Sequence, residues 1–160
     1  MRIDIAAVGR LKQGPERELV ARYAERLTAS GRAIGLSGPH LTEIAESPAR
    51  SAPERMAQEA QAVLAAIPAD ALLVALDERG ATMASDAFAA RIGRWRDEGR
   101  RNLAFVVGGP DGLSQLVRDR AAELISFGRM TMPHQLVRVL LLEQLYRAAT
   151  ILSGHPYHRV

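Results

Sequence analysis

The sequence predicts a single α/β domain built on a mostly parallel sheet. Short β-like runs alternate with stretches of helical spacing along all 160 residues, which is the pattern of this fold class. Two of the runs, at 71–76 and 103–107, are continuously apolar, as expected of parallel strands covered on both faces. Neither a linker nor an internal repeat divides the chain, so we expect one domain spanning residues 1–160.

The elements of the first half follow in order. Residues 3–9 form a β-like run that ends at glycine. Pro15 stands at the first position of a predicted helix, whose apolar residues recur at helical spacing to about residue 31. Residues 33–46 are ambiguous and favour extended chain. Ser51, followed by proline and Glu54, gives the capping signature of a helix that ends near residue 67.

The second half of the chain continues the alternation of strands and helices. Glycine or proline closes most of its segments. We expect a strand at 71–76, a helix from Ser85 to near Gly99, a strand at 103–107, a helix at about 114–122, a strand at 124–127 and a helix at about 133–153.

Composition excludes several classes of protein. Apolar residues make up 48% of the chain and charged residues 24%, so it is not disordered. The chain contains no run of 18 apolar residues, so no membrane span is predicted. Asp4 interrupts the N-terminal segment, where a signal peptide needs an apolar core. The chain has no cysteine, which excludes disulfides, a thiolate nucleophile and a cysteine-type zinc site. We therefore expect a cytoplasmic protein.

Basic residues gather toward both ends of the chain. Residues 1–39 and 124–160 each carry a net charge of +3, and the residues between them carry −3. Arginine accounts for all basic residues except Lys12, and its guanidinium suits bidentate contact with phosphate. The pattern favours a polyanionic partner such as nucleic acid, with codon bias as the alternative source of the arginines.

Two loops are candidate ligand-binding segments. The turn Gly108–Gly112 directly follows a buried strand, and open α/β sheets bind ligands at the carboxyl ends of their strands. It lacks the residues of a P-loop and the spacing of a dinucleotide fingerprint, and a tight structural turn is the alternative. The segment Phe127–His134 ends another strand. If the two loops lie side by side, they form one crevice whose backbone groups are free to bind adenine.

The last predicted helix and the tail after it carry the remaining candidates. The apolar surface of the helix is too wide for packing on one side, which indicates either full burial or a dimer interface. His155, Tyr157, His158 and Arg159 crowd the end of the chain and could transfer protons or contact RNA. His155 and His158 have the spacing of a metal pair, but Pro156 argues against a helix and no third ligand is evident, so no metal is expected.

Several of these motifs together resemble the RlmH family of the SPOUT superfamily. They are Val107–Ser114, Met130–Val139, Glu143–Ala148 and His155–His158. The resemblance implies an α/β fold with a C-terminal trefoil knot and a homodimer with the knot region at its interface. It also implies an S-adenosylmethionine-dependent enzyme that methylates N3 of a pseudouridine in helix 69 of 23S rRNA, acting on the 70S ribosome.

The resemblance also assigns site residues. It places cofactor contacts at Leu76, Gly108 and the loop Phe127, Gly128, Arg129, Met130, Thr131 and Met132. N3–H of a uracil-type ring is a weak acid, so a base or an anion-stabilising charge is needed. The candidates are His155, Tyr157 and His158 for proton transfer, and Arg138 or Arg159 for the anion.

Two other functions stay open. One is a Rossmann-type methyltransferase of a small molecule, although the segment after the first strand lacks its glycine fingerprint. The other is a non-catalytic ribosome-binding factor with a vestigial cofactor site. Binding of S-adenosylmethionine separates the second alternative from the two enzymes.

Overall fold

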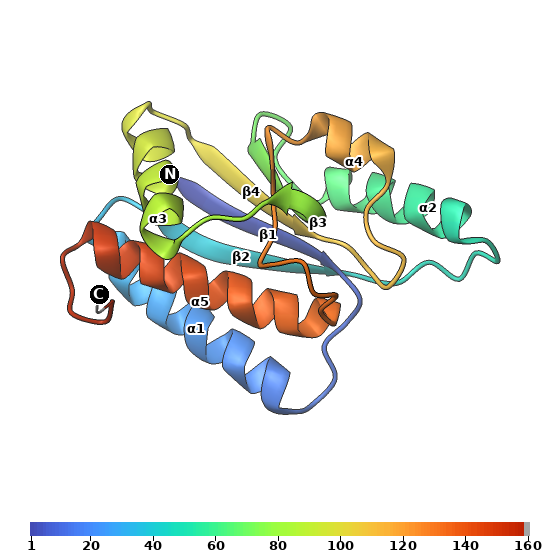
Figure 1. Cartoon of the computed structure of the whole chain (residues 1–160), viewed down its shortest axis with the longest axis horizontal. Coiled ribbons are helices and arrows are strands. Elements are labelled where there is room, and N and C mark those ends of the chain that lie inside the picture. The colour runs from blue at the N-terminus through green and yellow to red at the C-terminus, as the bar shows by residue number, and fades with distance from the viewer. Residues whose placement is uncertain (159–160) are drawn as a thin grey trace.

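The computed structural model describes residues 1–158, which form one sheet with helices on both of its faces (Figure 1). The elements are β1 (Arg2–Val8), α1 (Pro15–Arg32), β2 (Ser37–Ile44), α2 (Ala52–Ala65), β3 (Leu72–Ala81), α3 (Ser85–Asp97), β4 (Asn102–Val107), α4 (Gln115–Arg120), β5 (Glu123–Ile125) and α5 (His134–Leu152).

The sheet has the strand order β2-β1-β4-β3-β5, and every neighbouring pair is parallel. The predicted α/β class with a parallel sheet is therefore confirmed. Because all strands run the same way, their carboxyl ends meet at one edge, where the segments that follow β1, β3, β4 and β5 come together.

Strand residues alternate between two apolar cores. In β1, Ile3 and Ile5 join the core beneath α1, α3 and α5, whereas Ala6 and Val8 join the core beneath α2 and α4. The same alternation explains why residues 72–76 of β3 and 103–107 of β4 are apolar at every position. Figure 1 shows α1 and α5 side by side on one face of the sheet, with α2 and α4 together on the other.

Two helix starts differ in how they are capped. Ser51 caps α2 as predicted, because its hydroxyl accepts a hydrogen bond of 3.4 Å from the backbone N–H of Glu54. The helix expected from Ser85 begins at that residue, and Ala84 holds the cap position, so the Ser85 side chain does not cap α3. Its hydroxyl donates to Oε1 of Gln144 in α5 at 2.7 Å, so it joins two helices.

β3 extends beyond the apolar run that predicted it. Its last residue, Ala81, pairs with Ile125 of β5. A Cβ atom at Gly80 would lie 2.5 to 2.7 Å from the backbone of Ile125, so only glycine lets the two segments pass this closely. The knot that the family resemblance implies stays a prediction. Among residues 1–158, no helix combines the length and the apolarity needed to cross a membrane.

Candidate active site

The two candidate loops line one cavity at the carboxyl edge of the sheet. The cavity has a volume of about 830 Å³, which lies within the range of small-molecule sites. The end of β3 forms one part of its wall, the turn Gly108–Gly112 a second, and residues 125–134 a third.

The glycine turn depends on residues without a Cβ atom at two of its positions. The N–H of Gly112, whose φ is +84°, donates to the carbonyl of Gly109 at 3.0 Å. A Cβ atom at Gly108 would lie 2.9 Å from the backbone carbonyl carbon and oxygen of Gly112. A Cβ atom at Gly109 would lie 2.8 Å from Cγ1 of Val8. Glycine is thus required at 108 and 109 for the turn to close against β1.

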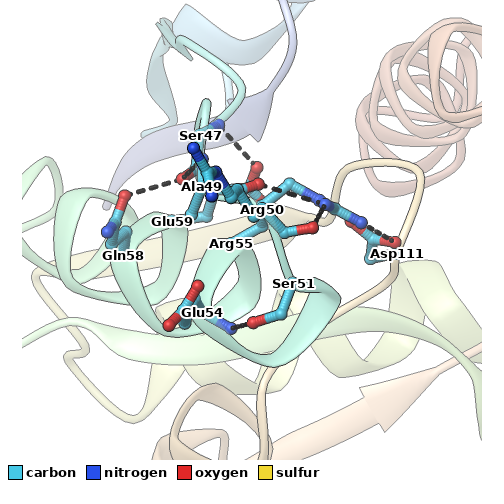
Figure 2. A network of polar contacts seen from close by, with 9 residues as sticks. All are labelled: Ser47, Ala49, Arg50, Ser51, Glu54, Arg55, Gln58, Glu59 and Asp111. Atoms are coloured by element: carbon cyan, nitrogen blue, oxygen red, sulfur yellow. Dashed lines mark hydrogen bonds and ion pairs between the residues drawn. The ribbon is translucent and has the colours of Figure 1, made fainter.

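An arginine of α2 binds this turn, as Figure 2 shows. Nε and Nη2 of Arg55 donate to the two carboxylate oxygens of Asp111 at 2.7 and 3.0 Å. Nη1 donates to the carbonyls of Ala49 and Arg50, each at 3.1 Å. The pairing raises the pKa of Arg55 and lowers the pKa of Asp111, in both cases chiefly through this hydrogen bond.

A second arginine fixes the end of β3. Asp77 is buried in the cavity wall, where its Oδ2 accepts a hydrogen bond of 2.7 Å from Nε of Arg118. Its Oδ1 accepts from the backbone N–H of Arg79 at 2.9 Å. The buried carboxylate is therefore paired and hydrogen-bonded, as a buried charge requires.

The third wall, after β5, is a loop closed by Ser126. The Ser126 hydroxyl donates to the carbonyl of Gly128 at 2.8 Å and accepts from the N–H of the same residue at 3.1 Å. Met130 is 80% exposed at the rim. Ser126 thus fixes the main chain of Gly128, which lines the cavity.

His134 links the cavity to a cluster of charges behind it. Its Nε2 faces Gly9, where a Cβ atom would lie 2.9 Å from it, 3.1 Å from Oε1 of Glu46 and 3.2 Å from Nη2 of Arg138. Burial lowers the pKa of His134, and Arg138 lowers it further, against the opposing effect of Glu46. The imidazole is thereby held neutral at neutral pH.

Arg138 is buried under this cluster, with 1% of its surface exposed. Nη1 donates to Oε1 of Glu43 at 3.0 Å, and Nη2 donates to the carbonyl of Val8 at 2.7 Å. Burial is the largest influence on its pKa, which it lowers, and Glu43 opposes that effect. Arg138 thus ties the first turn of α5 to the ends of β1 and β2.

The tail docks on the far half of α5. The Tyr157 hydroxyl donates to Oε1 of Glu143 at 3.1 Å, and its ring centroid lies 4.6 Å from that of Tyr146. The guanidinium of Arg147 lies 4.8 Å from the centroid of the Tyr157 ring, and its Nη1 lies 3.3 Å from Nδ1 of His158. Burial, together with the bond to Glu143, raises the pKa of Tyr157 to about 12.

Tyr23 of α1 extends the aromatic contacts of the tail. Its ring centroid lies 6.3 Å from that of Tyr146. The guanidinium of Arg26 lies 5.8 Å from both of these ring centroids. We call Tyr23, Tyr146 and Tyr157 the tyrosine stack.

With this geometry established, the chain can be compared with known proteins. A family model described as "Predicted SPOUT methyltransferase" matches residues 1–158. The chain belongs to the SPOUT methyltransferase family.

Relatives of known name agree with this assignment to the SPOUT family. The chain is 58% identical over 159 residues to the "Ribosomal RNA large subunit methyltransferase H" of Rhodopseudomonas palustris strain BisB18, with 99% of each chain covered. It is 59% identical to the protein of that name from Bradyrhizobium diazoefficiens, with the same coverage. The Methylorubrum populi protein of that name is 56% identical over 160 residues, 99% of this chain and 97% of that one.

Two solved structures share the SPOUT chain's fold. A probable methylase family protein from Haemophilus influenzae Rd KW20 superposes with a TM-score of 0.54 at 11% identity, over 99% of this chain and 70% of that one. A probable methyltransferase from Bordetella pertussis Tohama I gives a TM-score of 0.52 at 14% identity, over 92% of this chain and 95% of that one. At these identities, the likeness concerns the fold alone.

The cofactor contacts predicted for the SPOUT chain fall mostly on this cavity. Arg129 is exposed and does not line it. The predicted residues that do line it are Leu76, Gly108, Phe127, Gly128, Met130, Thr131 and Met132.

The predicted catalytic residues lie elsewhere in the SPOUT protomer. Glu143, the anchor of Tyr157, is nine residues beyond His134 in α5, which is about 13 Å along the axis. We expected the tail beside the methyl donor, possibly across a dimer interface. Within one protomer, Tyr157 and His158 lie away from the cavity and His155 is exposed. Arg159 lies outside the described residues.

The structure places Arg138 outside the cavity wall, although it was expected to meet an anion there. Its guanidinium is buried and donates to Glu43 and to the carbonyl of Val8. Within one protomer these contacts hold α5 to β1 and β2, and a role toward the anion stays a prediction.

Two contributors to the SPOUT site went unnoticed in the sequence. They are Arg55 of α2 and Arg118 of α4, which bind Asp111 and Asp77 of the cavity wall. Neither had a local signal, whereas His134 belongs to the predicted segment Phe127–His134 and lines the cavity. Within residues 1–158, no three His, Asp or Glu side chains gather closely enough to hold a metal ion.

Proposed function

We propose that this SPOUT protein is an S-adenosylmethionine-dependent methyltransferase of large-subunit ribosomal RNA. In finer detail, we propose that it methylates N3 of a pseudouridine in helix 69 of 23S rRNA within the 70S ribosome. One observation carries the proposal: 58 to 59% identity across 99% of each chain to relatives named as ribosomal RNA large subunit methyltransferase H.

The cavity suits S-adenosylmethionine on physical grounds. Its volume of about 830 Å³ fits a nucleoside with an amino-acid chain. Gly108 and Gly109 bring bare backbone to one wall, and the loop around Gly128 forms another. The bound cofactor supplies an electrophilic methyl group. The residues of this chain orient it and exclude water, so that alignment of the reactants provides much of the acceleration.

The tail supplies the groups that handle the N3 proton. With a pKa of about 12, the Tyr157 phenol stays protonated at neutral pH and acts as a hydrogen-bond donor. Proton acceptance then belongs to an imidazole, from His155 or His158, with Arg147 3.3 Å from Nδ1 of His158. Histidine titrates near neutrality and suits this exchange.

We propose a homodimer through α5, in which the tail of one protomer serves the cavity of the other. Met130 is 80% exposed, Leu136 is 43% exposed, and Leu140, about one turn beyond Leu136 in α5, is half-buried. A two-fold interface centred on these apolar residues sets the two α5 helices side by side in opposite directions. Each tail then lies near the partner's cavity, which removes the separation of about 13 Å along the helix.

Two measurements test the activity itself. Titration calorimetry reports S-adenosylmethionine binding, and tritiated methyl incorporation into ribosomes lacking the modification reports transfer. Binding with transfer to the N3 position supports the proposal. Binding with transfer only to small molecules would favour the second enzyme class, and absence of binding would leave the ribosome-binding factor.

A mixing experiment tests the shared site. Two variants should each be inactive as homodimers. The variant that lacks residues 155–160 has no tail, and the variant Gly108→Val has no functional cofactor site. Their heterodimer contains one intact cavity facing one intact tail, so mixing should restore up to about half of the activity per dimer. Heterodimers that form, as shown by mass spectrometry, yet stay inactive would rule out exchange of tails.

A further inference from the structure

The glycine turn, residues 108–112, forms one wall of the cavity and loses much conformational entropy when it is ordered. Gly108, Gly109 and Gly112 give it three residues without a Cβ, and glycine loses more conformational freedom on ordering than any other residue. The backbone N–H of Gly112 donates to the carbonyl of Gly109 across the turn. A contact from outside the turn can therefore add to its order.

Asp111 is the one charged residue of the turn, and Arg55 of α2 donates two parallel hydrogen bonds of 2.7 and 3.0 Å to its carboxylate. The fork of a guanidinium fixes orientation as well as distance. The pair is about a quarter exposed on each side, so it is accessible enough to be screened by salt.

Arg55 is itself held in one orientation. Its remaining nitrogen, Nη1, bonds the carbonyls of Ala49 and Arg50. The segment carrying these carbonyls is fastened to α2 by Glu59, whose Oε1 accepts from the N–H of Ser47 at 2.9 Å. Figure 2 shows these contacts converging on the first two turns of α2.

Glu59 also reaches beneath the turn. It is buried, and its Oε2 lies 3.4 Å from the point where a Cβ of Gly109 would stand. The start of α2 thus meets the turn at two points, Asp111 and Gly109, which is enough to fix its tilt as well as its position.

We propose that Arg55 is a positioning residue for the cofactor turn, holding residues 108–112 in the cavity-lining shape before the ligand arrives. The inference rests on the proposed function, since the ligand of the cavity is S-adenosylmethionine. Pre-ordering spares the ligand the entropic cost of ordering the turn, so its loss weakens binding without touching the reacting atoms.

The test compares Arg55→Gln with the matched control Arg94→Gln, an exposed arginine of α3 for which the structure shows no side-chain hydrogen bond or ion pair among the described residues. We expect Arg55→Gln to raise the Kd and the KM for S-adenosylmethionine about three- to tenfold, in line with a partly exposed bidentate pair. The kcat at saturating cofactor should change less than about twofold. The control should leave the Kd unchanged, and Arg55→Lys should recover part of the loss.

A double-mutant cycle separates positioning from direct contact. If Asp111 acts through Arg55, then Asp111→Asn raises the Kd about as much as Arg55→Gln, and the double variant is no worse than either. The exchanged pair Arg55→Asp with Asp111→Arg should regain affinity. Additive losses would overturn the inference, because they would mean that Asp111 binds the cofactor by itself.

Hydrogen exchange of the Gly112 amide gives a readout free of cofactor. In Arg55→Gln, this amide should exchange faster while amides of β1 and β4 stay unchanged. Unchanged exchange together with an unchanged Kd would refute the positioning role. If the wild-type protein binds no S-adenosylmethionine, both the proposed function and this inference are wrong. If the wild-type protein binds it and Arg55→Gln binds it equally well, only this inference is wrong.

Discussion

The buried pair of Arg138 and Glu43 leads to an asymmetric prediction for stability. The arginine side chain is fully buried, whereas the glutamate is about one-third exposed. Removing the arginine leaves a carboxylate that water can reach. Removing the glutamate leaves a buried guanidinium whose Nε already lacks a partner within the described residues.

The magnitudes follow from this difference in burial. Arg138→Met keeps most of the apolar stem but loses the hydrogen bonds to Glu43 and Val8. Because the variant no longer buries a charge, part of this loss is offset, and we expect the free energy of unfolding to fall by about 2 kcal/mol. Glu43→Leu strands the guanidinium and also removes the acceptor of the Leu11 N–H, which lies 2.9 Å from Oε1. We expect about 4 kcal/mol for that variant. The double variant should cost about 3 kcal/mol, well below the two single losses combined.

Urea denaturation followed by circular dichroism, at one fixed protomer concentration, measures these free energies. The reasoning fails if Arg138→Met is the costlier change or if the two losses are additive. A catalytic role for Arg138 predicts something different: transfer activity falling far more than the stability of the folded fraction allows.

Three further predictions concern the cavity and the interface. Gly108→Val should abolish S-adenosylmethionine binding in calorimetry while circular dichroism stays native, because a Cβ there would meet Gly112 at 2.9 Å; wild-type affinity would disprove the cofactor wall. Because the pKa of His134 is lowered in the folded protein, the unfolded chain binds a proton at this residue more readily. The free energy of unfolding therefore decreases as the pH falls below about 6.5, where the unfolded chain becomes protonated. His134→Gln should flatten the fall in unfolding free energy below about pH 6.5, and an unchanged slope there would contradict this. Leu136→Glu should shift light scattering from the dimer toward the 17.4 kDa monomer, whereas a wild-type protein that is already monomeric would refute the interface.

The sequence predicted the strands that are buried on both faces. In residues 72–76 of β3 and 103–107 of β4, alternate side chains enter different cores, so all of these positions are apolar and the pattern is clear. β2 stayed ambiguous because it is an edge strand and is only partly buried. Half-exposed strands tolerate polar residues such as Thr42 and Glu43, which hide the pattern.

The candidate site divides along similar lines. Parallel strands bring their following loops to one edge, so two loops recognised by their glycines and by family motifs line one cavity. Arg55 and Asp111 are 56 residues apart, and Arg138 and Glu43 are 95 apart. No local pattern pairs such residues, because only the tertiary fold brings them together. The position of the tail could not be read from the chain for the same reason.

The separation of the aromatic residues gives this protein two independent optical probes. Its one tryptophan, Trp95, is 7% exposed in the core beneath α3 and α5, so its fluorescence reports whether that core is packed. All three tyrosines belong to the tyrosine stack that carries the tail. Ultraviolet absorbance of the phenols therefore follows docking of the tail, and the two signals together distinguish release of the tail from global unfolding without any added label.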